Sequence, residues 1–135
     1  MRLSARGQYG LRAVVELAGA YSRGPLPLRE IAQAQEVSPA YLEQIMLALR
    51  RAGLVVSARG ARGGYALARP PREITVGQVV RALEGPIAPV ACASEEESPP
   101  CRRAPSCPAR RAWLRLRDGI AQALDTTTIA ELLDG

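Results

Sequence analysis

Residues 28–67 read LREIAQAQEVSPAYLEQIMLALRRAGLVVSARGARGGYAL and carry the clearest structural pattern in the chain. Ser38 followed by Pro39 predicts the start of a helix, because serine caps a helix N-terminus well and proline fits the first helical position. The apolar residues that follow recur at the spacing of one buried helix face: Leu42, Ile45, Met46 and Leu49. Gly53 should end this helix, because glycine tolerates the left-handed conformation in which helices often stop.

A shorter helix is predicted just before this one, and a β-hairpin just after it. The residues expected to face the core or close the intervening turn are Leu28, Ile31, Ala32 and Val37. After Gly53, residues 54–58 and 65–68 are β-prone runs joined by Arg59–Gly64, a loop with three glycines and two arginines. This order of elements indicates a winged helix-turn-helix, so DNA is the first partner to consider. The alternative is an ordinary surface hairpin on a small α+β domain.

The longer of the two helices is the candidate recognition helix and should enter the major groove of DNA. There Glu43 can accept a hydrogen bond from a cytosine N4 amino group, and Gln44 can pair with adenine. Tyr41 either contacts the DNA backbone or fills the core. Arg50 and Arg51 lie beyond the base-contacting end, where they either grip phosphates or stay solvated.

Two arginines, Arg59 and Arg62, sit on the predicted wing, where they could insert into the minor groove or clamp its walls. The glycines beside them let the backbone approach another surface closely. The complete set of residues predicted to contact DNA is Arg2, Arg6, Ala40, Tyr41, Glu43, Gln44, Arg50, Arg51, Arg59, Gly60 and Arg62.

Charge is divided unevenly along the chain. Residues 1–75 hold 11 arginines against five glutamates, a net charge of +6, whereas residues 76–135 hold seven arginines against eight acidic residues, a net charge of −1. A phosphate-binding face backed by a separate assembly region would explain this division. The chain has no histidine and no paired acids beside a plausible base or nucleophile, which argues against an enzyme. No signal or transmembrane segment is evident, so we expect a cytoplasmic protein that does not bind membranes.

The expected fold is mostly α-helical with a small β-wing. We assign residues 1–85 to a winged helix-turn-helix DNA-binding domain, residues 86–108 to a cysteine-bearing sensor loop, and residues 109–135 to a dimerisation helix and a short C-terminal helix. The first helix is expected to bury a stripe made of Leu11, Val14, Val15, Ala18 and Tyr21.

Two capping boxes predict the starts of later helices. Thr75 is followed after three residues by Gln78, and Thr128 by Glu131. Between these boxes, a long amphipathic helix carries the apolar stripe Ala109, Ala112, Trp113, Leu116, Ile120, Ala123 and Leu124. Such a helix at the end of a DNA-binding domain usually packs against its own copy, because operators are read as two half-sites. The alternative is a helix that packs into the core of its own chain.

All three cysteines, Cys92, Cys101 and Cys107, lie in the proline-rich sensor loop with the spacing C-x8-C-x5-C. An odd number of cysteines in a cytoplasmic chain argues against a disulfide framework. Zinc usually requires four protein ligands and a close cysteine or histidine pair, which this loop lacks. Three readings stay open from the spacing: an iron-sulfur centre with a fourth ligand from elsewhere, a redox-active thiol, or inert thiols.

Several segments together resemble the Rrf family of bacterial winged-helix regulators, particularly its IscR/NsrR-like iron-sulfur branch. They are MRLSARGQYGLRA (1–13), SPAYLEQIMLALRRAGLV (38–55), RGARGGYAL (59–67), ITVGQVVRALEG (74–85), the three-cysteine loop and TTTIAELL (126–133). The resemblance implies a homodimeric transcription factor that binds promoter DNA. It also implies that the three cysteines hold an iron-sulfur cluster, [2Fe-2S] rather than [4Fe-4S], and that Glu43 and Arg59 read or approach bases.

The chain departs from this branch at the fourth ligand. The gap between the first two cysteines is three residues longer than usual, Arg110 stands where one group has a ligating histidine, and Gln8 stands where another has an aspartate from the second subunit. The candidates for the fourth ligand are Gln8, one of Glu95–Glu97, a water or a small thiol.

Two functions of other kinds remain as alternatives. One is a cluster-free regulator of the same fold that controls cysteine or sulfur metabolism through a partner enzyme or thiol oxidation. The other is a small cluster carrier or electron-transfer protein, in which the basic wing would be needless.

Overall fold

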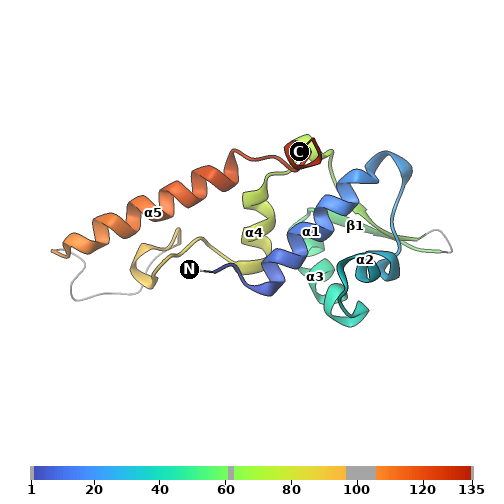
Figure 1. Cartoon of the computed structure of the whole chain (residues 1–135), viewed down its shortest axis with the longest axis horizontal. Coiled ribbons are helices and arrows are strands. Elements are labelled where there is room, and N and C mark those ends of the chain that lie inside the picture. The colour runs from blue at the N-terminus through green and yellow to red at the C-terminus, as the bar shows by residue number, and fades with distance from the viewer. Residues whose placement is uncertain (1, 61–62, 97–105, 135) are drawn as a thin grey trace.

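The computed structural model describes residues 2–60, 63–96 and 106–134. Its helices and strands in chain order are α1 (Ala5–Gly19), α2 (Leu28–Gln35), α3 (Pro39–Arg51), β1 (Val55–Ala58), β2 (Gly64–Leu67), α4 (Val76–Glu84), α5 (Pro108–Asp125) and α6 (Ile129–Leu133). Three short 3-10 turns lie between them: η1 (Tyr21–Arg23), η2 (Pro71–Glu73) and η3 (Ala91–Ala93). Helices α1–α4, α6 and the β-hairpin form one packed unit, here called the head, and α5 extends away from it (Figure 1).

The helix-turn-helix is built as its local residues predict. The Ser38 hydroxyl accepts a hydrogen bond from the amide of Tyr41 at 3.1 Å, and α3 starts at Pro39. Gly53 follows α3 with a φ of 76°, in the left-handed region. The predicted face of Leu42, Ile45, Met46 and Leu49 is fully buried. One feature has no sequence signal: α2 ends at Glu36, a non-glycine residue with a φ of 57°.

The predicted stripe on α1 is only partly correct. Val14 and Ala18 are buried, whereas Leu11 and Val15 are half-buried, and Tyr21 lies beyond the helix with 40% of its surface exposed. The residues of α1 that are buried are Gly7, Gly10, Ala13, Val14, Leu17 and Ala18. The physical reason is a close crossing with α4, because a Cβ at Gly10 would collide with the Leu83 side chain. Small residues therefore occupy the contact where large apolar ones were expected.

The β-hairpin is a two-stranded antiparallel sheet that a third segment extends. Val55 pairs with Leu67 and Ala58 with Gly64. Leu26, in the loop after α1, pairs with Tyr65 through two backbone hydrogen bonds of 2.9 and 2.8 Å. The wing is thus attached to the loop that leads into the helix-turn-helix.

Helix α6 packs on the head although it follows α5 in the sequence. Ile129 is fully buried in the head's core, and its amide donates to the carbonyl of Ile74 at 2.8 Å. Both predicted capping boxes are present, at the starts of α4 and α6. By contrast, α5 has no buried residue, and Trp113 is 39% exposed. Within the described residues, no helix is long and apolar enough to cross a membrane.

Candidate DNA-reading face and sensor segment

One side of α3 is buried in the head and the opposite side is open. The open side carries four exposed residues at helical spacing, here called the reading face: Ala40, Glu43, Gln44 and Leu47. Arg50 and Arg51 are exposed at the end of the same helix. Glu43 and Gln44, the two residues predicted to read bases, are therefore exposed on the same side of the helix.

The start of α1 lies beside the start of α3. The ring of Tyr9 meets that of Tyr41 edge-on, with centroids 6.2 Å apart, and the Arg12 guanidinium lies 5.5 Å from the Tyr9 centroid. Tyr41 is half-buried and packs against the core, which supports its core reading over a contact with the DNA backbone. Arg6 is exposed in the first turn of α1, three positions before Tyr9.

The remaining predicted DNA contacts are spread over two places. Arg59 and Gly60 are exposed at the tip of the wing. Arg62 lies outside the described residues. Arg2 lines a groove between the N-terminal segment and α5, away from the wing. The described members of the predicted set are therefore exposed on α3 and at the wing tip, and Arg2 lies apart from both.

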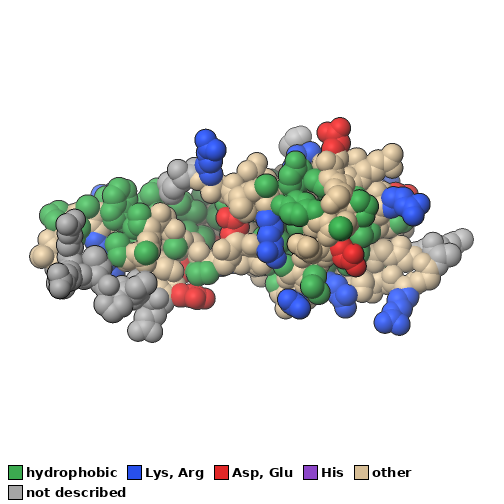
Figure 2. Space-filling view, turned by 90° about the horizontal axis from the view of Figure 1, so that it is seen from below, with side chains coloured by type: hydrophobic (Ala, Val, Ile, Leu, Met, Phe, Trp, Pro, Cys, Tyr) green, Lys and Arg blue, Asp and Glu red, His purple; other side chains and the backbone are tan. Residues whose placement is uncertain are grey.

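Most described arginines of the N-terminal half form no ion pair, although two side-chain nitrogens of Arg69 are buried and the Arg12 guanidinium lies over the Tyr9 ring. Among the described residues, the only ion pair formed by an arginine of residues 2–75 is that of Arg72 with its neighbour Glu73, at 3.9 Å on the surface. The ion pairs of the C-terminal half are shorter and join Arg81 and Arg117 to acidic residues. In Figure 2, which views the molecule from the side of α3, arginines project from several points of the right-hand half, where the head lies. Free cations gathered on one unit are what a phosphate-binding surface needs.

Residues 86–96, the longer of the two described stretches of the predicted sensor loop, are here called the sensor segment; residues 106–108 are the other stretch. The sensor segment is anchored by two buried residues, Ile87 and Ala93, although it contains no regular pattern. Arg110 contacts both described cysteines of the predicted loop: its side chain donates to the carbonyl of Cys92 at 3.3 Å, and its amide donates to the carbonyl of Cys107 at 3.2 Å. Both cysteines are half-buried free thiols. The structure thus brings Cys92 to the start of α5, which Cys107 precedes.

Cys101 lies outside the described residues, as does Glu97. Among the described residues no group of three metal-ligating side chains is formed. Thiolates are the ligands that iron-sulfur clusters use, so Cys92 and Cys107 are residues of the type that such a centre requires.

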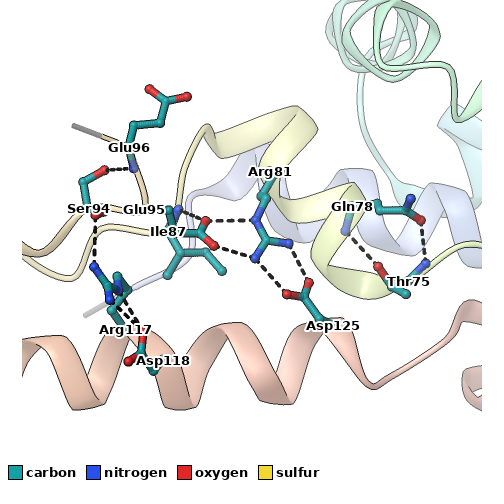
Figure 3. Close-up of polar contacts among 10 residues, drawn as sticks. All are labelled: Thr75, Gln78, Arg81, Ile87, Ser94, Glu95, Glu96, Arg117, Asp118 and Asp125. Carbon is teal, nitrogen blue, oxygen red and sulfur yellow. Dashed lines mark hydrogen bonds and ion pairs between the residues drawn. The ribbon is translucent and has the colours of Figure 1, made fainter.

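Glu95 is engaged elsewhere, which corrects one candidate for the fourth ligand. Its two oxygens accept hydrogen bonds from Arg81 of α4 at 2.9 and 2.7 Å, and one also accepts from the amide of Ile87 at 2.7 Å. Figure 3 shows Arg81 between Glu95 and Asp125 of α5. The hydrogen bond from Arg81 holds the pKa of Glu95 below its usual value. A carboxylate held in this way is not available to a metal without breaking the network.

The Arg81 network was not foreseen, because it joins residues 14 and 44 positions apart. It connects the sensor segment to the head through α4 and to α5 through Asp125. Arg117 adds a further link by donating to the carbonyl of Ser94 at 3.2 Å (Figure 3). Three arginines thus hold Cys92 and the residues just after it, through the carbonyls of Cys92 and Ser94 and the carboxylate of Glu95.

We expect the attachment of the sensor segment to weaken in acid. Because the folded-state pKa of Glu95 is lowered, its stabilising contribution is complete above about pH 4.5 and is lost as the pH falls through the lowered value. Hydrogen exchange at the Ile87 amide should therefore accelerate below about pH 4.5, beyond the intrinsic pH dependence of exchange. Glu95→Gln should show fast exchange already at neutral pH, whereas Glu96→Gln should match the wild type. Equal exchange in all three proteins would contradict the role given to this contact.

A groove of about 610 Å³ separates the start of the chain from α5. Its lining is mostly apolar and includes Leu3, Val80, Ile87, Ile120 and Leu124. The open apolar stripe of α5 begins at this groove, and Figure 2 shows hydrophobic side chains gathered over the left-hand half, where α5 and the sensor segment lie. An apolar surface of this extent is typical of an interaction site.

Comparisons with known proteins agree with this architecture. A family model described as "Rrf2: Iron-dependent Transcriptional regulator" matches residues 3–135. The regulator CymR of Bacillus subtilis (strain 168) is 45% identical over 133 residues, which cover 98% of this chain and 89% of that protein. Its solved structure, described as that of the global cysteine regulator, superposes with a TM-score of 0.81 over 98% of this chain and 95% of that one. The structure of T. potens IscR is 37% identical, with a TM-score of 0.79 over 99% of this chain and 87% of that one.

Proposed function

The chain belongs to the Rrf2 family of winged-helix DNA-binding transcription regulators, and on this premise we propose that it is a homodimeric regulator that senses iron-sulfur, redox or nitric oxide status through Cys92, Cys101 and Cys107. The observation that carries the DNA-binding part is the open side of α3 next to a basic wing. The relatives are transcriptional regulators rather than enzymes. The proposed location is the cytoplasm, where thiols stay reduced.

Helix α3 would enter the major groove, with Glu43 and Gln44 directed at base edges. The wing would place Arg59 and Gly60, together with Arg62, against the minor groove. Arg6, Arg50 and Arg51 lie around α3 where phosphates would pass, and Arg2 would contact DNA only at the margin of this surface. The proposed boundaries at residues 85 and 108 divide the chain into a DNA-binding unit, a sensor loop and a dimerisation helix, and α6, which follows that helix, packs back on the head.

The proposed dimer uses α5. Its residues are all at least partly exposed, Trp113 among them, and the groove beside it is lined by apolar side chains of α4 and α5. A second copy of α5 seated in this groove would cover both surfaces at once. Two heads would then face successive major grooves, as two half-sites require.

Cys92, Cys101 and Cys107 would hold the cluster, with Gln8 from a second copy, Glu96, Glu97, a water or a small thiol as the fourth ligand. Such a cluster supplies a centre that can gain or lose an electron or be removed by oxidants and nitric oxide. The chain's own residues would carry the effect, because Arg110, Arg117 and Arg81 connect the sensor segment to α5 and to the head. A change in the loop would therefore alter the placement of the heads.

The proposal is tested with protein purified without air and with DNA that it selects from a random-sequence library. We expect a visible absorption band, an EPR signal in one redox state, and enrichment of a two-fold symmetric sequence. Cys101→Ala should remove the colour and change affinity for the selected DNA about tenfold, a coupling of roughly 1.4 kcal/mol. Ser106→Ala, in the same loop, is the matched control. A colourless Cys101→Ala protein with wild-type affinity would leave the cysteines without a regulatory role.

A second candidate function is a cluster-free regulator of cysteine or sulfur metabolism that acts through a partner enzyme or thiol oxidation. The 45% identity to CymR, whose structure is described as that of a cysteine regulator, favours it. A protein that stays colourless after anaerobic purification and still selects a DNA sequence would support this candidate over the first.

A further inference from the structure

Leu47 is a large apolar side chain that the core does not use. It is 43% exposed, and it belongs neither to the buried cluster of the head nor to the half-buried residues packed against it. Two other apolar residues of α3, Met46 and Leu49, are fully buried. The fold therefore gives no packing reason for a leucine at position 47.

Its place on the helix gives a functional reason. Relative to Ala40, the residues Glu43, Gln44 and Leu47 stand three, four and seven positions further on, so all four share one side of α3. The recognition helix of a homeodomain reads bases with four residues that have this same spacing. Leu47 thus extends the reading face by one helical turn beyond Glu43.

The chemistry of leucine selects its target among the base edges. A leucine side chain offers no hydrogen-bond donor or acceptor, and the only apolar group on the major-groove edge of a base pair is the C5 methyl of thymine. Contacts with phosphates are left to Arg50 and Arg51, which lie further along the same helix. A contact between Leu47 and a methyl group would remove both apolar surfaces from water.

We propose that Leu47 is a specificity-determining residue that reads a thymine methyl in each half-site, adjacent to the bases read by Glu43 and Gln44. This inference rests on the proposed DNA-binding function and adds to it one base and the group that recognises it. Ala40, at the other end of the face, can also contact a thymine methyl, so the methyl dependence assigned to Leu47 is the part that Leu47→Ala removes.

The test uses duplexes that the wild-type protein enriches from a random-sequence library, with each thymine replaced in turn by deoxyuridine. This exchange removes only the methyl group, so it leaves every hydrogen-bonding atom in place. In the wild type, one thymine per half-site should respond with an affinity loss of about fourfold, the value of one buried methyl. Leu47→Ala should bind the thymine and deoxyuridine duplexes equally at that position, and Leu47→Met should keep the response.

Leu133→Ala is the matched control, because Leu133 is 42% exposed on α6, on the opposite side of the head from α3 (Figure 1). It should retain the thymine response of the wild type. An unchanged thymine response in Leu47→Ala, or no thymine that responds in the wild type, would overturn the inference while the proposed function stands. A library that yields no enriched sequence would overturn the proposed function and this inference with it.

Discussion

Raising the salt concentration from about 50 to about 200 mM should weaken DNA binding by about a thousandfold. If about six phosphates are neutralised in the complex, the logarithm of the association constant falls against the logarithm of salt concentration with a slope of roughly −5. The physical basis is the +6 excess of residues 1–75, whose arginines form a single exposed ion pair among the described residues. The measurement is a set of binding isotherms, by fluorescence anisotropy, on the library-selected duplex and on random DNA.

Two variants that each remove one arginine charge show whether the salt dependence comes from contacts with phosphates or from the net charge of the protein. Arg51→Gln, at the open end of α3, should reduce the magnitude of the slope by about 1 on both kinds of DNA. Arg117→Gln removes the same charge from a residue that is already bound to Asp118 and Ser94, so it should leave the slope unchanged. A flat salt response, or equal effects of the two variants, would place the DNA-binding surface elsewhere.

Features that depend on a few neighbouring residues were predictable from the sequence. Ser38 with Pro39, Thr75 with Gln78 and the left-handed Gly53 each act within one helical turn, so the chain encodes the ends of α3 and the start of α4 locally. The reading face follows from them, because fixing the start of α3 also fixes which of its sides is buried.

Features that depend on distant residues were not predictable. The stripe on α1 was misassigned because its buried side is set by the crossing with α4 at Gly10, where Leu83 fills the space. Gln35 is buried and its side-chain amide donates to Glu16, nineteen positions earlier, a pairing that the amphipathic pattern of α2 does not signal. No local pattern singles out Arg81, and only the folded chain places it between Glu95 and Asp125.

The attachment of the wing depends on one glycine, and replacing it should have the largest effect on stability. Gly64 has a φ of 146°, and a Cβ there would collide with the backbone of Leu26 and Pro27. Gly64→Ala can be accommodated only if Leu26 separates from Tyr65, which breaks two backbone hydrogen bonds. Together with the unfavourable φ, this should cost about 2 to 5 kcal/mol of folding free energy. Urea denaturation followed by circular dichroism measures the loss.

The same substitution should also affect DNA recognition, because the wing carries Arg59 and is attached to the head through Leu26. At urea concentrations below the unfolding transition, the Gly64→Ala protein should lose more affinity for the selected duplex than for random DNA. A displaced wing still carries its positive charge, but it no longer holds Arg59 in a fixed position against the bases. Gly19→Ala is the control: this glycine has open space around it, so the change should alter stability by no more than about 1 kcal/mol. If Gly64→Ala matched Gly19→Ala in both measurements, the wing would not be held by its contact with Leu26, and its arginines would reach DNA from a mobile hairpin.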